Sequence, residues 1–208
     1  MLARRMIDPF PRPITAIRLD GGRPCIDFVN SVHDRFALVT EDYLATPERY
    51  VEWARRTRML GANEEILLPK GDRVQLMADI RSLRDAMLYL LEARIDGLPF
   101  PADPLRTTNR WLLEARNDQE LTDDGRLDLR PRQGDALVPL KRLALDLVDT
   151  LALARDGRLK LERCANQQSC GWLFADTSKN GRRRWCAMQT CGVASKMATL
   201  RQKSSAAP

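Results

Sequence analysis

The stretch RCANQQSCGWLFADTSKNGRRRWCAMQTCG, residues 163–192, decides how the C-terminal part of this chain is expected to fold. It contains four of the chain's five cysteines, arranged as two close pairs with five residues inside the first pair, four inside the second and fifteen between the pairs. Zinc takes four tetrahedral ligands, and two short turns that each supply two thiolates provide them without a distant helix or sheet. Because the stretch has few large apolar residues, a metal would replace the burial that so small a module lacks. We therefore predict a zinc site formed by Cys164, Cys170, Cys186 and Cys191.

Two other states of these cysteines remain open, namely disulfides and buried free thiols. The N-terminal MLARRM, soon followed by Asp8 and Pro9, is not typical of a secretory signal, and only Cys25 lies outside the cluster. These features favour a reducing cytoplasm, in which clustered cysteines more often bind metal than form cross-links. The gaps inside the pairs are wider than the commonest two-residue knuckle, so spacing alone does not exclude the alternatives.

The whole stretch resembles the zinc finger of the bacterial CGNR family. That family's pattern has a cysteine, a short turn, C-G-W-L-F, an Asp, a Ser with a basic residue, an Arg-Arg-Trp-Cys block, a Met and a closing C-G-N-R. The matching positions here are Cys164, 170–174, Asp176, Ser178, Lys179, 183–186, Met188, Cys191 and Gly192. Val193 and Ala194 replace the closing Asn and Arg. The resemblance therefore implies metal binding, without any contact that the family's arginine makes.

A second segment, IRLDGGRPCIDFVNSVHDR at residues 17–35, predicts a short strand, a Gly-Gly turn and a helix that begins at Pro24 and continues past His33. It resembles the leading motif of the ABATE domain, which accompanies this finger and carries an Asp-Phe-Val-Asn block after a Gly-rich turn. The resemblance implies a domain that senses a small-molecule effector or forms a homodimer. Candidate ligand-binding residues are Asp27, Asn30 and His33; the alternative is that these are ordinary solvated helix residues.

The rest of the chain predicts a mainly helical first domain. Capping and stop residues, together with apolar positions three to four apart, predict helices over about 47–60, 71–96, 103–117 and 135–155, with a hairpin at 120–131. In the finger, 159–163 and 172–175 alternate like strands, and the chain should be helical from about Cys191, which is a treble-clef order. The predicted fold is mainly α (α+β): a helical domain with a small strand element at 1–157, and a treble-clef-like finger at 158–208.

Positive charge is concentrated in the finger. The net charge is +6, yet from Lys160 onward nine Lys or Arg face only Glu162 and Asp176, so the excess is local and indicates a polyanionic partner. Candidate nucleic-acid-binding residues are Lys179, Arg182, Arg183 and Arg184 between the cysteine pairs, and Lys196, Arg201 and Lys203 on the last helix. A solvated basic face is the alternative, because charge clusters alone are unspecific.

Three classes of function follow from these features. The first is a DNA-binding transcription regulator, with RNA binding as a variant. The second is a zinc-stabilised module that binds an acidic protein. The third, an enzyme, is not expected, because the sequence lacks a Gly-rich phosphate loop and a nucleophile elbow, and four thiolates leave zinc no open position for water. No apolar run approaches the ~18 to 20 residues that span a bilayer, so we expect a cytoplasmic protein without a membrane partner.

Overall fold

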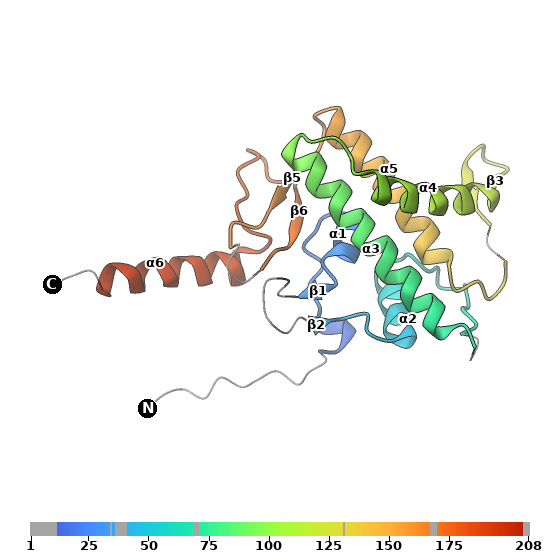
Figure 1. Ribbon diagram of the computed structural model, residues 1–208, viewed down its shortest axis with the longest axis horizontal. Coiled ribbons are helices and arrows are strands. Elements are labelled where there is room, and N and C mark those ends of the chain that lie inside the picture. Colours follow the sequence, from blue (N-terminus) through green and yellow to red (C-terminus); the bar gives the residue numbers. More distant parts are fainter. Residues whose placement is uncertain are drawn as a thin grey trace.

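The computed structural model describes residues 12–33, 35, 41–68, 71–130, 132–166 and 170–205. Figure 1 shows a helical body, a small two-stranded finger against one side of it, and a last helix that projects away from both. The described helices and strands are η1 (Ile14–Ala16), α1 (Pro24–Val29), β1 (Val32–His33), β2 (Glu41–Asp42), α2 (Pro47–Arg56), α3 (Arg73–Asp96), α4 (Ala102–Asn117), β3 (Gln119–Leu121), β4 (Leu127–Leu129), α5 (Val138–Arg155), β5 (Lys160–Arg163), β6 (Leu173–Asp176), η2 (Met188–Gly192) and α6 (Val193–Ser205). This arrangement confirms the mainly helical α+β fold with a small C-terminal finger.

The long helices form the core of the body. The predicted apolar stripe of α3 is buried, with Leu76, Ile80, Leu83, Met87 and Leu90 all at most 5% exposed. The helix ends where predicted, because Gly97 adopts φ +66°, a left-handed conformation that favours glycine. The helices α4 and α5 and the antiparallel β3–β4 hairpin also lie close to their predicted positions.

The helix α2 begins as predicted and ends early. Thr46 caps it by accepting a hydrogen bond from the Arg49 amide at 3.4 Å, and Pro47 occupies the first turn. The helix ends at Arg56, four residues before the predicted end. The cause lies at Arg58, whose φ of +62° takes the backbone out of the helical region before Gly61 is reached.

The segment before α2 corrects two predictions. No strand forms at 17–20; instead Ile17 packs into the core, and the Gly21 carbonyl accepts one hydrogen bond from the Ala175 amide of β6. The following helix ends at Val29, so His33 lies on strand β1, which pairs with β2, rather than on a helix. Asn30 is the C-cap of α1, and its side chain is bonded to the Leu173 backbone of β6.

The finger is docked on the helical body through a shared core. Its strand β5 packs against α3, and β6 packs against α1. The Arg163 guanidinium at the end of β5 forms a two-bond ion pair with Asp96 at the end of α3, at 2.6 and 2.8 Å. The Trp172 indole donates to the Val32 carbonyl at 3.1 Å. The finger therefore rests on the first domain by burial and by hydrogen bonds.

Candidate metal centre and nucleic-acid interface

Strands, a loop and one helical turn bring the four cysteines together. Cys164 follows β5 directly and Cys170 precedes β6, so the antiparallel pairing of these strands places the first pair at the turn between them. The Cys164 amide donates to the Trp172 carbonyl at 2.9 Å, and the Ala165 amide donates to the Arg184 carbonyl at 2.8 Å, which holds the second loop against the first. Cys186 lies on that loop and Cys191 on η2. The order of strand, first pair, strand, second pair and helix agrees with a treble-clef-like finger.

The geometry of the sulfur atoms fits a single metal ion. All four Sγ atoms lie within 4.8 Å of one another, and all four residues are buried. The Cys170–Cys186 and Cys186–Cys191 sulfur pairs are 3.6 and 3.5 Å apart, far longer than the ~2.05 Å of a disulfide. A tetrahedron with metal–sulfur bonds of ~2.3 Å has edges of about 3.8 Å, close to these values. The four cysteines could therefore hold one metal ion as thiolates.

The electrostatics of the cluster favours thiolate at Cys164. Hydrogen bonds from the Cys170 thiol, and then from Cys186 and Cys191, hold the pKa of Cys164 well below its ordinary value, and hydrogen bonding to Cys164 raises the pKa of Cys170 and Cys186. Thiolate is the form of cysteine that ligates metals. Because four sulfur ligands fill a tetrahedral coordination shell, a metal bound here would be structural.

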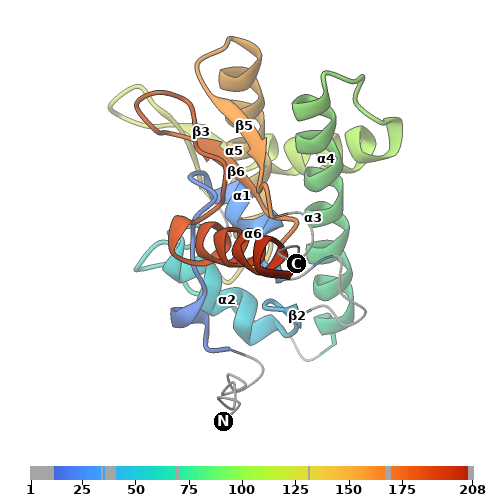
Figure 2. The ribbon, with the colours of Figure 1, turned by 90° about the vertical axis from the view of Figure 1, so that its left-hand side faces the viewer.

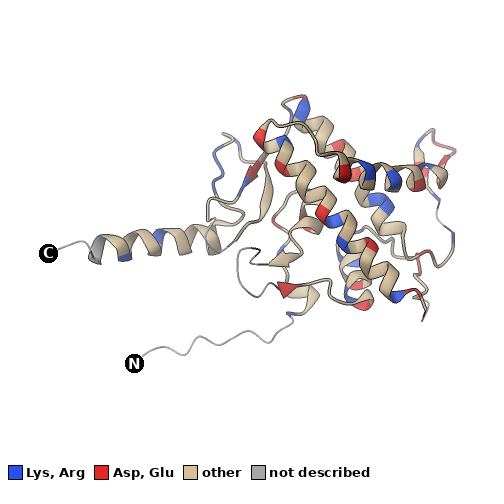
Figure 3. Ribbon diagram, in the orientation of Figure 1, with Lys and Arg blue, Asp and Glu red and all other residues tan. Residues whose placement is uncertain are grey.

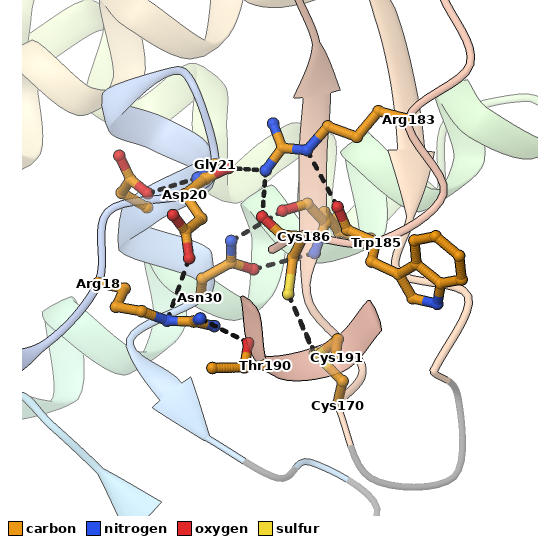
Figure 4. A network of polar contacts seen from close by, with 12 residues as sticks. Arg18, Asp20, Gly21, Asn30, Cys170, Arg183, Trp185, Cys186, Thr190 and Cys191 are labelled. Atoms are coloured by element: carbon orange, nitrogen blue, oxygen red, sulfur yellow. Dashed lines mark hydrogen bonds and ion pairs between the residues drawn. The ribbon is translucent and has the colours of Figure 1, made fainter. Parts of the chain in front are cut away.

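Arg183 ties the second loop to the rest of the molecule, as Figure 4 shows. Its Nη2 donates to the Asp20 carbonyl at 2.9 Å and also to the Cys186 carbonyl, and its Nε donates to the Trp185 carbonyl at 3.0 Å. The guanidinium carbon lies 4.4 Å from the centre of the Phe174 ring. These contacts direct the guanidinium of Arg183 toward the protein interior. A residue that binds a polyanion would instead present its guanidinium to solvent.

The other basic residues of the loop face solvent. Lys179, Arg182 and Arg184 are exposed, and the Arg184 guanidinium lies over the Trp185 ring at 5.0 Å. Asp176 shapes the loop that carries them, because its carboxylate accepts the backbone amides of Ser178 and Arg183 at 2.9 and 3.0 Å. Hydrogen bonding to Ser178 accordingly holds the pKa of Asp176 below its ordinary value.

The last helix carries the second set of cations. Lys196 and Arg201 are exposed on α6, which points toward the viewer in Figure 2; the side chain of Lys203 lies outside the described residues. The helix begins at Met188 as the π-helical turn η2, earlier than predicted. A Cβ at Gly192 would lie 2.5 Å from the Met188 sulfur, so a larger residue there would displace the flexible Met188 side chain. Val193 has helical φ and ψ of −65° and −47° and directly follows η2, so it lies inside the helix and an Asn there would not be an N-cap.

The three candidate ligand-binding residues do not converge on one site. Asp27 accepts the Gly21 amide at 2.8 Å, and burial raises its pKa to about 7. Asn30 is bonded to the backbone of Leu173. His33 lies near the rings of Tyr43 and Trp172, with ring centres 6.0 and 5.9 Å away, and lines a cavity of about 320 Å³ beside Cys170 and Cys191.

A larger cavity of about 470 Å³, which the sequence did not indicate, lies between the end of α3, the following loop and the end of α5. The loop reads GLPF at 97–100, which predicted only the end of a helix. Its apolar residues were the available signal, but their partners on α5 are some fifty positions away.

The fold and the cysteine cluster define the class of this protein: a helical body with a small finger that carries a candidate metal centre. Comparison with known families identifies the family within that class. Residues 22–157 match the ABATE family, described as "Putative stress-induced transcription regulator", and residues 160–204 match the CGNR zinc finger. Since the first match spans more than half of the chain, this protein belongs to the ABATE family and carries a CGNR zinc finger. No curated protein matches the chain. Within the described residues, no helix combines the length and apolarity that crossing a membrane requires.

Proposed function

We propose that this protein is a DNA-binding transcription regulator whose zinc-stabilised finger contacts the duplex, while its helical domain senses a small molecule or dimerises. It acts by binding and not as an enzyme. The observation that carries the proposal is α6, a projecting helix without a single acidic residue, which carries exposed cations and continues directly from the cysteine site.

The dimensions and chemistry of α6 suit the major groove. Its 13 residues span about 20 Å, and the groove, about 12 Å wide, admits an α-helix. Lys196 and Arg201 are five positions apart, so they leave the helix in different directions and can reach phosphates on both sides of the groove. Between them lie Thr199, which can hydrogen-bond to base edges, and Met197, which can contact thymine methyl groups.

The loop between the cysteine pairs offers a second basic surface. Lys179, Arg182 and Arg184 are exposed there, and Figure 3 shows the basic segments of this loop and of α6 on the same side of the molecule, away from the mixed charges of the body. Contacts of this kind position a protein on DNA without reading its sequence. We exclude Arg183 from this surface because its guanidinium is already bonded within the protein.

Zinc would couple the two basic surfaces. Cys186 lies at the end of the basic loop, and Cys191 lies in the helical turn that leads into α6. One ion held by both residues, and by Cys164 and Cys170, would fix the loop and the helix relative to each other.

A specific observation favours a second function, binding to a protein. Val193, Met197 and Leu200 are 48%, 47% and 58% exposed, and their i, i+4, i+7 spacing places them along one stripe of α6. An acidic partner with a complementary apolar groove could cover this stripe.

The test is fluorescence anisotropy of a labelled random-sequence duplex, titrated with protein at several salt concentrations. We expect the slope of log K against log salt to fall by about 1.8 in Arg182→Gln/Arg184→Gln, and similarly in Lys196→Gln/Arg201→Gln, because each variant removes two phosphate contacts. Arg126→Gln, an exposed arginine on the β3–β4 turn, is the matched control and should change nothing. Absence of binding at low salt would reject DNA binding and favour a protein partner. Binding with equal slopes in all variants would show that these two basic surfaces do not contact the phosphates.

A further inference from the structure

The cavity between α3 and α5 has the composition of a binding site for a small apolar molecule. It encloses about 470 Å³, within the range of ligand sites in proteins. Leu98 and Phe100 from the α3–α4 loop and Val148 and Leu151 from α5 line it, together with Arg94 and Arg155. Leu98 is 61% exposed and Val148 is 43% exposed, so the apolar wall is open to solvent.

Arg94 is the feature that points to a charged ligand. Its Nη2 donates to the Ala154 carbonyl at 2.6 Å, and its Nε is buried without a hydrogen-bond partner. Among the described residues, no carboxylate forms an ion pair with it. The buried Nε is not accessible from the cavity, so an anion would pair with the remaining Nη donors of this half-buried cation, which otherwise has no charged partner in the described part of the chain. By contrast Arg155, at the rim, is paired with Asp156.

We propose that this cavity binds an apolar monocarboxylate, with its carboxylate on Arg94 and its hydrocarbon part between the α3–α4 loop and α5. A carboxylate matches the planar donors of a guanidinium and supplies the single negative charge that Arg94 lacks. A polyanion fits less well, because most of the lining is apolar and the second arginine already has a partner.

The position of the cavity gives its ligand a route to the finger. Arg94 lies two residues before Asp96, which holds Arg163 of β5 in a two-bond ion pair. On the opposite wall, α5 ends at Arg155 and the chain continues into β5 and Cys164. A ligand that changes the spacing of the two helix ends would therefore act on β5 from both sides. This regulatory consequence rests on the proposed function; the binding site does not.

Calorimetry without DNA tests the binding, so that its outcome is independent of DNA affinity. The probes are decanoate and 1-naphthoate, each below its aggregation concentration, with acetate and decyltrimethylammonium as controls for the chain and the charge. We expect saturable 1:1 binding of at least one carboxylate probe and none of the controls.

Two variants locate the site. Arg94→Met should weaken carboxylate binding at least about tenfold, because it removes a charge-assisted hydrogen bond. Val148→Trp should abolish binding by filling the cavity, while Val74→Trp, at an 83% exposed position of α3, should bind like the unaltered protein. If Arg94→Met does not fold, Val148→Trp decides alone. The proposal is overturned if neither probe binds, if a folded Arg94→Met binds the carboxylate as the unaltered protein does, or if binding persists unchanged in Val148→Trp.

Discussion

Replacing Asn30 with Ala should destabilise the protein by disconnecting the finger from the helical body. In the β5–β6 pair, the Cys164 amide bonds to the Trp172 carbonyl. Hydrogen-bonded pairs alternate along an antiparallel ladder, so the amide and carbonyl of Leu173 point away from β5. Asn30 receives both: its Nδ2 donates to the Leu173 carbonyl at 2.8 Å, and its Oδ1 accepts from the Leu173 amide at 3.0 Å. Its side chain thus substitutes for a third strand.

The structure sets the size of the effect. Asn30 is 2% exposed and Leu173 is also 2% exposed, so water does not readily replace the lost partner. Each buried backbone group left unpaired costs ~1 to 3 kcal/mol, which gives ~2 to 6 kcal/mol for the two groups. For a protein of this size, that loss corresponds to a decrease in Tm of roughly 5 to 25 °C.

Urea unfolding of the metal-loaded protein, followed by circular dichroism, measures the change. Asn109→Ala, at an exposed position of α4, is the matched control and should stay within ~1 kcal/mol of the unaltered protein. Asn30→Asp separates the two bonds, because a carboxylate still accepts from the Leu173 amide but cannot donate to its carbonyl. We expect it to be no more stable than Asn30→Ala. If Asn30→Ala unfolds at the same urea concentration as Asn109→Ala, the two hydrogen bonds between Asn30 and Leu173 do not hold the finger on the helical body.

Three further predictions concern the metal, a buried acid and the end of the finger. Replacing any one of the four clustered cysteines with Ser (Cys164, Cys170, Cys186 or Cys191) should abolish binding of the single metal ion, as measured by mass spectrometry, and leave most of the helical circular dichroism signal. The control Cys25→Ser should keep the metal, and an unchanged metal content in a cluster variant would contradict the site. Burial raises the pKa of Asp27 to about 7 in the folded state, so the contribution of this residue to stability is present at acidic pH and is lost as pH rises from about 4 through 7. Over that range, the free energy of unfolding of the unaltered protein should fall relative to that of Asp27→Asn, but not relative to that of the control Asp123→Asn. Val193→Asn with Ala194→Arg should raise DNA affinity without changing finger stability, because residue 193 lies inside the helix and not at its N-cap; a rise in stability alone would show that Asn acts as a cap after all.

Local sequence patterns were sufficient where structure depends on neighbours in the chain. The stripe of α3 is read from apolar residues three to four apart, and its end from Gly97. The start of α2 follows from Thr46 and Pro47. The cysteine cluster is equally local, because two close pairs on two turns need only a hairpin and one helical turn to meet.

Tertiary contacts decided the roles of side chains that look equivalent in the sequence. Arg182, Arg183 and Arg184 form one basic run, yet only Arg183 turns inward, because the carbonyls of Asp20, Trp185 and Cys186 and the ring of Phe174 surround that position. Nothing in the run itself distinguishes the middle arginine.

Asn30 shows the same limit over a longer distance. The sequence places it among the polar residues of a helix, whereas the structure places it against Leu173, 143 positions away. A strand edge that exposes its amides and carbonyls must find partners when it is buried, and any segment that folds against it can supply them. Which segment does so depends on how the helical body packs, so the docking of the finger has no signature in either stretch of sequence alone.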